Sequence, residues 1–74
     1  MASESSGELL LTVNGETRRI ASGASIADLV VSLDLDPKKV AVEHNAEIAP
    51  RSMLAAIALA DGDVLEIVHF VGGG

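Results

Sequence analysis

The sequence predicts an α+β fold in which one main helix packs across a small mixed sheet. Several short runs of strand-forming residues are separated by turn residues, and one segment has clear amphipathic helical spacing. A chain of 74 residues has room for one domain. Its core must be aliphatic, because 49% of the residues are hydrophobic and Phe70 is the only Phe, Tyr or Trp.

The first two strands are predicted to form a hairpin. Leu9–Val13 is rich in strand formers, and Asn14-Gly15 follows it directly, which is a strong hairpin signal because both residues tolerate positive φ angles. A second strand is expected from about Glu16 to Ala21. If Leu9, Leu11 and Val13 face the core, Leu10 and Thr12 face away from it. A loop of two residues and a loop of three pair Ile20 with different partners, and both registers stay open.

The helix is predicted from Ile26 to about Leu33, where apolar residues recur at i, i+3, i+4 and i+7. Ser25 is a good N-cap. Asp28 can sit over the positive helix start, although it is shorter than the Glu or Gln of a capping box. Pro37 disfavours the α conformation at the preceding residue and so ends the helical region.

Three more strands are expected in the second half of the chain. They are Val40–His44, a short edge strand Glu47–Ala49 after an Asn45-Ala46 turn, and Val64–Val71, the longest, which we place centrally in the sheet. Arg51–Ala60 is rich in alanine, which favours a helical turn or a partly irregular connection.

The order of these elements predicts their topology. Economical packing lays the helix across one face of the sheet, with the first and last strands side by side and parallel. This is the β-grasp arrangement seen in ubiquitin. The β-grasp domain is expected to span residues 8–71, between a disordered polar lead at residues 1–7 and a flexible glycine tail at residues 72–74.

Composition and charge narrow the possible partners. The formal charge is −6, from 11 acidic and 5 basic residues, which repels phosphate backbones and disfavours nucleic acid. A protein partner fits better. Without cysteine there is no disulfide, no thiolate metal site and no catalytic thiol. The N-terminus lacks the features of a signal peptide and no stretch is long enough to span a bilayer, so we expect a cytoplasmic, soluble protein that does not bind membranes.

The polar motifs have structural explanations. Asp61-Gly62-Asp63 is expected to be a turn with Gly62 at an unusual φ, since an EF-hand needs more oxygen ligands than it offers. His44 and His69 lie on different predicted strands without a third ligand at recognisable spacing, so we assign them structural or surface roles and expect no metal site. No arrangement of nucleophile, base and acid is visible, and the chain looks unlike a self-sufficient enzyme.

The C-terminal residues Gly72, Gly73 and Gly74 admit two interpretations. Glycines at a terminus are commonly frayed. Alternatively, glycines without Cβ atoms can thread a narrow channel in a partner enzyme. A terminal carboxylate, ionised at neutral pH, can attack the α-phosphate of ATP, and the resulting acyl adenylate can accept sulfur. Under this hypothesis Gly74 is the modified residue.

The segments TVNGE (12–16), SIADLV (25–30), VAVEHNAEIAPR (40–51) and LADGDVLEIVHFVGGG (59–74) together resemble the ThiS family, the sulfur carriers of thiazole biosynthesis for thiamine. The likeness runs from Leu9 to Gly74. Ala49 stands where a bulkier aliphatic residue is common, and the polar lead is longer than usual.

The resemblance implies a ubiquitin-like β-grasp carrier that is acted on by enzymes and binds no permanent cofactor. An adenylyltransferase related to ubiquitin-activating enzymes would adenylate Gly74, using ATP and magnesium. A cysteine desulfurase system would then supply the sulfur of a thiocarboxylate, and thiazole synthase would receive it. Gly73 completes the family's glycine pair, and Gly72 extends the tail.

Partner recognition is expected on strands one and five, on the face turned away from the helix, and alternation along the last strand leaves open which residues face out. We expect Phe70 to contact a partner because of its size and its nearness to the tail; the alternative is that it belongs to the core. The rival functions are the small subunit of molybdopterin synthase, a ubiquitin-like protein modifier and an inert β-grasp binding module.

Overall fold

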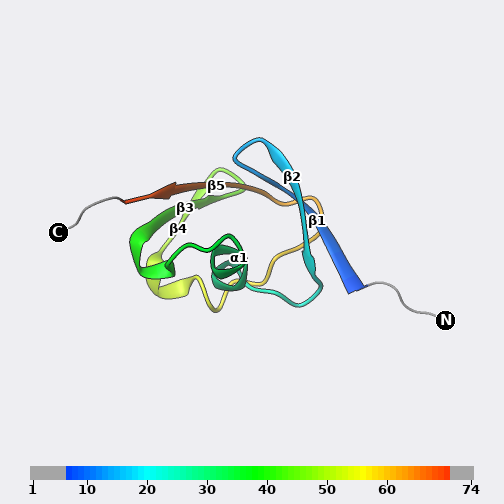
Figure 1. Cartoon of the computed structure of the whole chain (residues 1–74), viewed down its shortest axis with the longest axis horizontal. Helices are drawn as coiled ribbons and strands as arrows, with labels where there is room; N and C mark the ends of the chain where they lie inside the picture. The colour runs from blue at the N-terminus through cyan, green and yellow to red at the C-terminus, as the bar shows by residue number, and fades with distance from the viewer. Residues whose placement is uncertain (1–6, 71–74) are drawn as a thin grey trace.

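The computed structural model describes residues 7–70, within which five strands form one mixed sheet in the order β2-β1-β5-β3-β4 (Figure 1). The strands are β1 (Glu8–Val13), β2 (Glu16–Ala21), β3 (Val40–His44), β4 (Glu47–Ala49) and β5 (Val64–His69). The helices are α1 (Ile26–Ser32) and two short 3₁₀ helices, η2 (Pro37–Lys39) and η3 (Arg51–Met53). Residues 1–6 of the predicted lead, Val71 and the predicted tail at residues 72–74 lie outside the described residues.

The topology confirms the predicted α+β fold. β5 lies centrally, parallel to β1 and antiparallel to β3, as the β-grasp arrangement requires. The β1–β5 pairing is short, with Thr12 opposite Val64 and Val13 opposite Leu65, whereas five residue pairs join β3 to β5. The helix α1 covers one face of this sheet (Figure 1).

The β1–β2 hairpin has a two-residue loop, which settles the register. Asn14 and Gly15 have φ angles of 52° and 83°, the positive values of a type I′ turn, and Val13 pairs with Glu16 across it. Ile20 therefore lies opposite Leu9. The inward side chains of β1 are those of Leu9, Leu11 and Val13, which are more buried than their neighbours.

The amide of Asn14 also reaches the central strand, a role that the turn signal did not reveal. Its Oδ1 accepts a hydrogen bond from the Ile67 N–H at 2.7 Å, and its Nδ2 donates to the Ile67 carbonyl at 3.1 Å. The short ladder between β1 and β5 is thus continued by a side chain that imitates a strand neighbour.

The helix begins at a complete capping box. Ser25 Oγ accepts a hydrogen bond from the Asp28 N–H at 3.1 Å, and the Asp28 carboxylate accepts one from the Ser25 N–H at 2.9 Å. Asp is therefore long enough for the reciprocal bond here. The helix ends at Ser32, one residue before the predicted Leu33, which is the C-cap and precedes Asp34 in a left-handed conformation (φ 63°).

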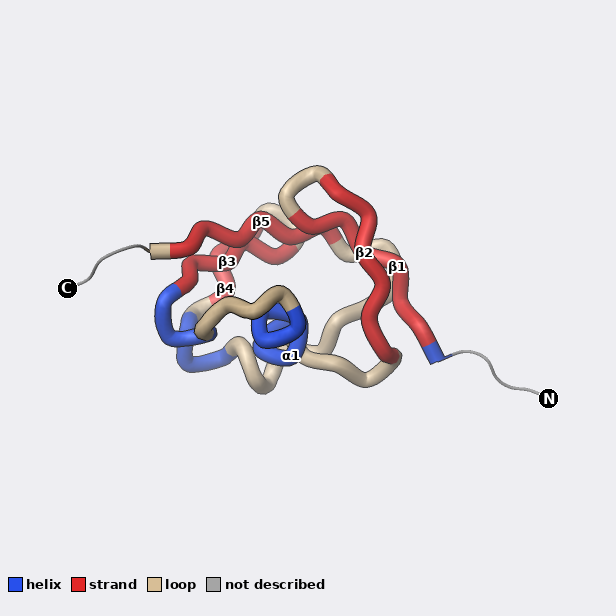
Figure 2. Tube along the Cα trace, in the orientation of Figure 1, coloured by secondary structure: helices blue, strands red, loops and turns tan. Residues whose placement is uncertain are grey.

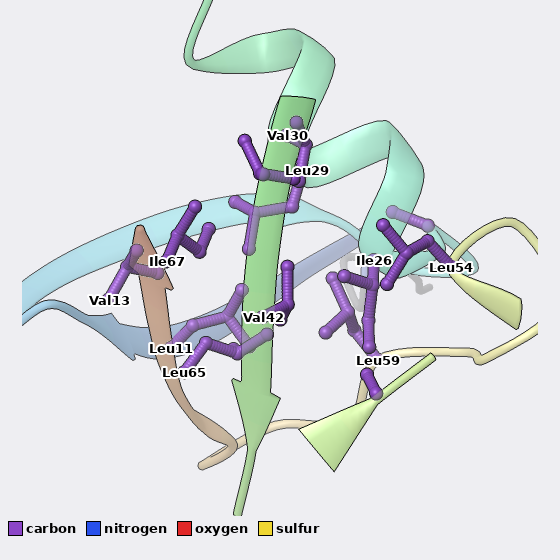
Figure 3. Close-up of a cluster of buried hydrophobic side chains, with 13 residues drawn as sticks. Leu11, Val13, Ile26, Leu29, Val30, Val42, Leu54, Leu59, Leu65 and Ile67 are labelled. Atoms are coloured by element: carbon purple, nitrogen blue, oxygen red, sulfur yellow. The ribbon is translucent and has the colours of Figure 1, made fainter. Parts of the chain in front are cut away.

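The core lies between α1 and the inner face of the sheet and is aliphatic, as the composition predicted. Figure 3 shows side chains of α1 meeting those of the strands in one cluster. The connection over residues 51–60 is a 3₁₀ helix followed by turns, and it contributes two buried leucines. The buried hydrophobic residues are Leu11, Val13, Ala24, Ile26, Leu29, Val30, Val40, Val42, Ala49, Leu54, Leu59, Leu65 and Ile67.

Replacing Asn14 with Gly preserves the turn but removes both hydrogen bonds to Ile67. We expect Asn14→Gly to lower the free energy of unfolding by about 1–3 kcal/mol, measured by urea denaturation. Ala46→Gly is the matched control, because Ala46 occupies the second position of the β3–β4 turn at φ 71°, where glycine relieves strain and no side-chain bond is lost. Equal destabilisation of both variants would contradict a role for the Asn14 amide.

Candidate functional site at the end of the central strand

The predicted tail originates at the end of β5, on the side of the molecule occupied by η2 and η3 (Figures 1 and 2). His69, the last residue of β5, is exposed, and Phe70 is the last described residue. The predicted reactive residue Gly74 and its neighbours Gly72 and Gly73 lie outside the described residues. The structure therefore defines the base from which the tail departs.

Phe70 is held at this base by main-chain and side-chain contacts. Its N–H donates to the Lys39 carbonyl at 2.8 Å, and the Arg51 guanidinium lies 5.8 Å from the centroid of its ring, within cation–π range. Arg51 Nη1 also donates to the Lys38 carbonyl at 3.3 Å. The Phe70 side chain is 47% exposed and is not part of the buried core, so it is accessible for the partner contact that stays a prediction.

Alternation along β5 resolves which residues face outward. Leu65 and Ile67 are buried in the core, whereas Val64, Glu66 and Val68 are exposed on the opposite face. The outward face of β5 thus carries two valines and one glutamate, and Val68 is the outward residue nearest the base of the tail.

This outward face carries a shallow hollow over β3, β4 and β5. Two acidic side chains, Glu43 and Glu66, lie directly opposite each other across the β3–β5 ladder. Like charges in this arrangement destabilise a sheet slightly. Exposed apolar side chains surround them, including Ile48 and Val68, so the face is an open, mixed surface suited to a protein contact.

A polar network at the start of β5 was not anticipated. The predicted turn is confirmed, with Gly62 at φ 89°, but Asp63 is buried and bound from three sides. Its Oδ2 lies 2.7 Å from His44 Nε2 and accepts from the Ala60 N–H at 2.9 Å, while Oδ1 accepts from Asn45 Nδ2 at 3.0 Å. Of the structural and surface roles that were predicted for the histidines, His44 therefore has the structural one, with a partner that was not predicted.

Burial acts to raise the pKa of Asp63, but the hydrogen bonds from His44, Asn45 and the Ala60 N–H outweigh burial and hold the pKa of that carboxyl below its usual value. No sequence signal joins these positions, because His44 and Asp63 come together only when β3 pairs with β5.

Within residues 7–70, no group of three or more His, Cys, Asp or Glu side chains is placed to hold a metal ion. His44 and His69 lie at opposite ends of the β3–β5 ladder, His44 opposite Leu65 and His69 opposite Val40. In the same part of the chain, no helix is both long and apolar enough to cross a membrane. The contacts of Phe70 hold the chain in place at the end of β5.

Comparisons with known proteins, by sequence and by structure, agree with the fold described above. The model of the ThiS family matches residues 11–74. The chain is 42% identical over 66 residues to the sulfur carrier protein ThiS of Bacillus subtilis, covering 88% of this chain and all of that relative. The crystal structure of a thiamine biosynthesis protein (ThiS) from Geobacter metallireducens superposes with a TM-score of 0.74 at 33% identity, covering 89% of this chain and 100% of that one. The ubiquitin-like β-grasp assignment is thereby confirmed.

A longer relative is also similar. A thiazole synthase of Paramagnetospirillum magneticum is 48% identical over 64 residues, which are 86% of this chain. The chain spans 20% of the length of that relative.

The lowered pKa of Asp63 makes the stability of the fold depend on pH. The carboxylate contributes stability that is fully present above its unfolded pKa of about 3.9 and is lost as the pH falls through the lower pKa of the folded state. We expect Asp63→Asn to be less stable at pH 7 by about 1–3 kcal/mol and to lose less stability on acidification. Urea denaturation between neutral pH and about pH 2.5 measures both effects. Parallel acid losses in the two proteins would contradict the assignment.

Proposed function

Because the chain belongs to the ThiS family, a family of sulfur carriers, we propose that it carries sulfur for thiazole formation in thiamine biosynthesis, as a thiocarboxylate on Gly74. The observation that carries the proposal is the family match, which runs through the three glycines at residues 72–74 and is joined by a relative named sulfur carrier protein that is matched over its whole length.

The proposed chemistry takes place on the carbonyl carbon of Gly74. A carboxylate oxygen attacks the α-phosphate of ATP, pyrophosphate leaves, and an acyl adenylate forms. A sulfur nucleophile at the oxidation level of sulfide then attacks the carbonyl carbon, the bond from that carbon to AMP breaks, AMP leaves, and a thiocarboxylate remains. ATP and magnesium belong to the adenylating partner, so the carrier acts as a co-substrate and binds no permanent cofactor.

The folded domain allows the adenylating enzyme to recognise this chain. An adenylating enzyme must distinguish one carboxylate from all others, so the chain supplies a recognisable surface while glycines without side chains supply reach. Val68, on the outward face of β5, and the exposed ring of Phe70 lie near the base of the tail and are suited to this contact.

The proposed partners are an adenylyltransferase related to ubiquitin-activating enzymes, a cysteine desulfurase system and thiazole synthase. Similarity to a region of a protein named thiazole synthase supports thiazole, rather than molybdopterin, as the destination of the sulfur. A sequence that matches a fifth of a protein named thiazole synthase is expected to cooperate with that activity when it occurs as a separate chain.

Intact-mass measurement tests the chemistry. After incubation with ATP, magnesium, the adenylating enzyme and a sulfur source, we expect a mass gain equal to the exchange of one oxygen for sulfur, localised to Gly74. Deleting Gly74, or adding one residue after it, should abolish the gain and leave the circular dichroism spectrum unchanged. If the mass of the carrier does not change with competent partners, the proposal is wrong. It is also wrong if the variant with one residue added after Gly74 shows the full mass gain without being trimmed.

Phe70→Ala tests the recognition surface. We expect this variant to raise the KM for the carrier in ATP–pyrophosphate exchange by roughly tenfold with little change in kcat, because an aromatic anchor is lost from the contact. Val31→Ala is the matched control. Val31 is 59% exposed on α1, so this substitution also removes exposed apolar surface, but on the helix. Equal effects of the two substitutions would show that Phe70 is no specific contact.

A further inference from the structure

The five basic residues of the chain fall into two groups with different surroundings. Arg18 and Arg19, on β2, each pair with a carboxylate, Glu16 at 3.6 Å and Glu8 at 3.5 Å. Lys38, Lys39 and Arg51 take part in none of the ion pairs formed within residues 7–70. Their positive charge is therefore not neutralised by a neighbouring carboxylate in that part of the chain.

The second group lies together at the end of β5, and we call Lys38, Lys39 and Arg51 the basic exit cluster. Three contacts described above assemble it around Phe70: the N–H of Phe70 on the Lys39 carbonyl, the guanidinium of Arg51 over the ring, and the bond from Arg51 to the Lys38 carbonyl. All three basic residues are exposed. The cluster thus surrounds the last described residue before the tail.

The acidic residue nearest in sequence, Asp36, offsets only one of the three positive charges. Asp36 caps η2, and its carboxylate accepts a hydrogen bond from the backbone N–H of Lys38 at 2.9 Å, while the Lys38 side chain is exposed. Elsewhere the balance is strongly acidic, because the chain as a whole has 11 acidic residues. The molecule is therefore electrically polarised, with its cationic end where the tail departs.

We propose that the basic exit cluster is a docking surface for an acidic rim around the opening that accepts the tail on the adenylating enzyme. This inference rests on the proposed function. A protein surface is the fitting occupant, because an arginine beside an exposed aromatic ring is the typical composition of an interface anchor, whereas a polyanion would be repelled by the remaining acidic surface.

The cluster orients the carrier during encounter. Charges at the rim of an interface act mainly on the association rate and are screened by salt. A cationic end attracted to an acidic opening turns the tail toward it, and the excess acid elsewhere disfavours every other approach. Charge thereby aligns the reacting end before apolar contacts form.

A charge-matched pair of double variants tests this arrangement. Lys38→Gln with Lys39→Gln and Arg18→Gln with Arg19→Gln each remove two positive charges from exposed positions, so the net charge changes equally. Association with the adenylating enzyme encoded by the same genome is measured by stopped flow at low and at physiological ionic strength. We expect the lysine variant to associate roughly tenfold more slowly at low salt, and less than that at physiological salt, while the arginine control stays within about twofold of the unsubstituted chain.

The outcomes separate the two proposals. Equal slowing of both variants would mean that only net charge matters and would overturn the docking surface, as would no slowing of the lysine variant. Slowing confined to the lysine variant, without a thiocarboxylate mass gain in the unsubstituted chain, would support the docking surface and overturn the sulfur chemistry. Failure of the unsubstituted chain to bind the enzyme at any ionic strength would overturn both. Circular dichroism confirms that both variants are folded.

Discussion

The hydrogen bonds that hold β5 between β1 and β3 are the constraint on which the rest of the structure depends. Two turn asparagines secure this strand in addition to the ladders. Asn45 Oδ1 accepts from the Val64 N–H at 2.9 Å at the start of β5, and the amide of Asn14 pairs with Ile67 further along. Both asparagines adopt left-handed conformations (φ 52°), so the turn geometry that closes each hairpin also aims an amide at the central strand.

A firmly held central strand gives the segment that follows Phe70 a defined starting point. The core under β5, the buried Asp63 network just before its first residue and the Phe70 contacts just after its last residue hold this strand in three places. In a carrier whose proposed chemistry lies four residues beyond Phe70, recognition by the fold and reaction at the tail are joined through this strand.

Much of the fold was predictable because its signals are local. The Asn14-Gly15 turn, the spacing of apolar residues in α1 and the central strand near the C-terminus depend on neighbouring residues, and each was predicted correctly. The predicted extent of that strand, Val64–Val71, was wrong at its end, because β5 stops at His69 and is no longer than β1 or β2. The contacts of His44 with Asp63 and of Arg51 with Phe70 depend on tertiary pairing of positions far apart in sequence. Residue identity alone does not disclose such pairs, so the environment of the candidate site required the structure.

The unequal ladders on the two sides of β5 also have a mechanical consequence. A pull on the chain end, as when a partner withdraws from a bound tail, acts through Phe70 along the axis of β5. The five residue pairs with β3 are then loaded together in shear and share the force, instead of being peeled apart one by one. The Phe70 N–H bond to Lys39 is the first contact to bear the load, so the sheet is most heavily reinforced on the side where tension enters.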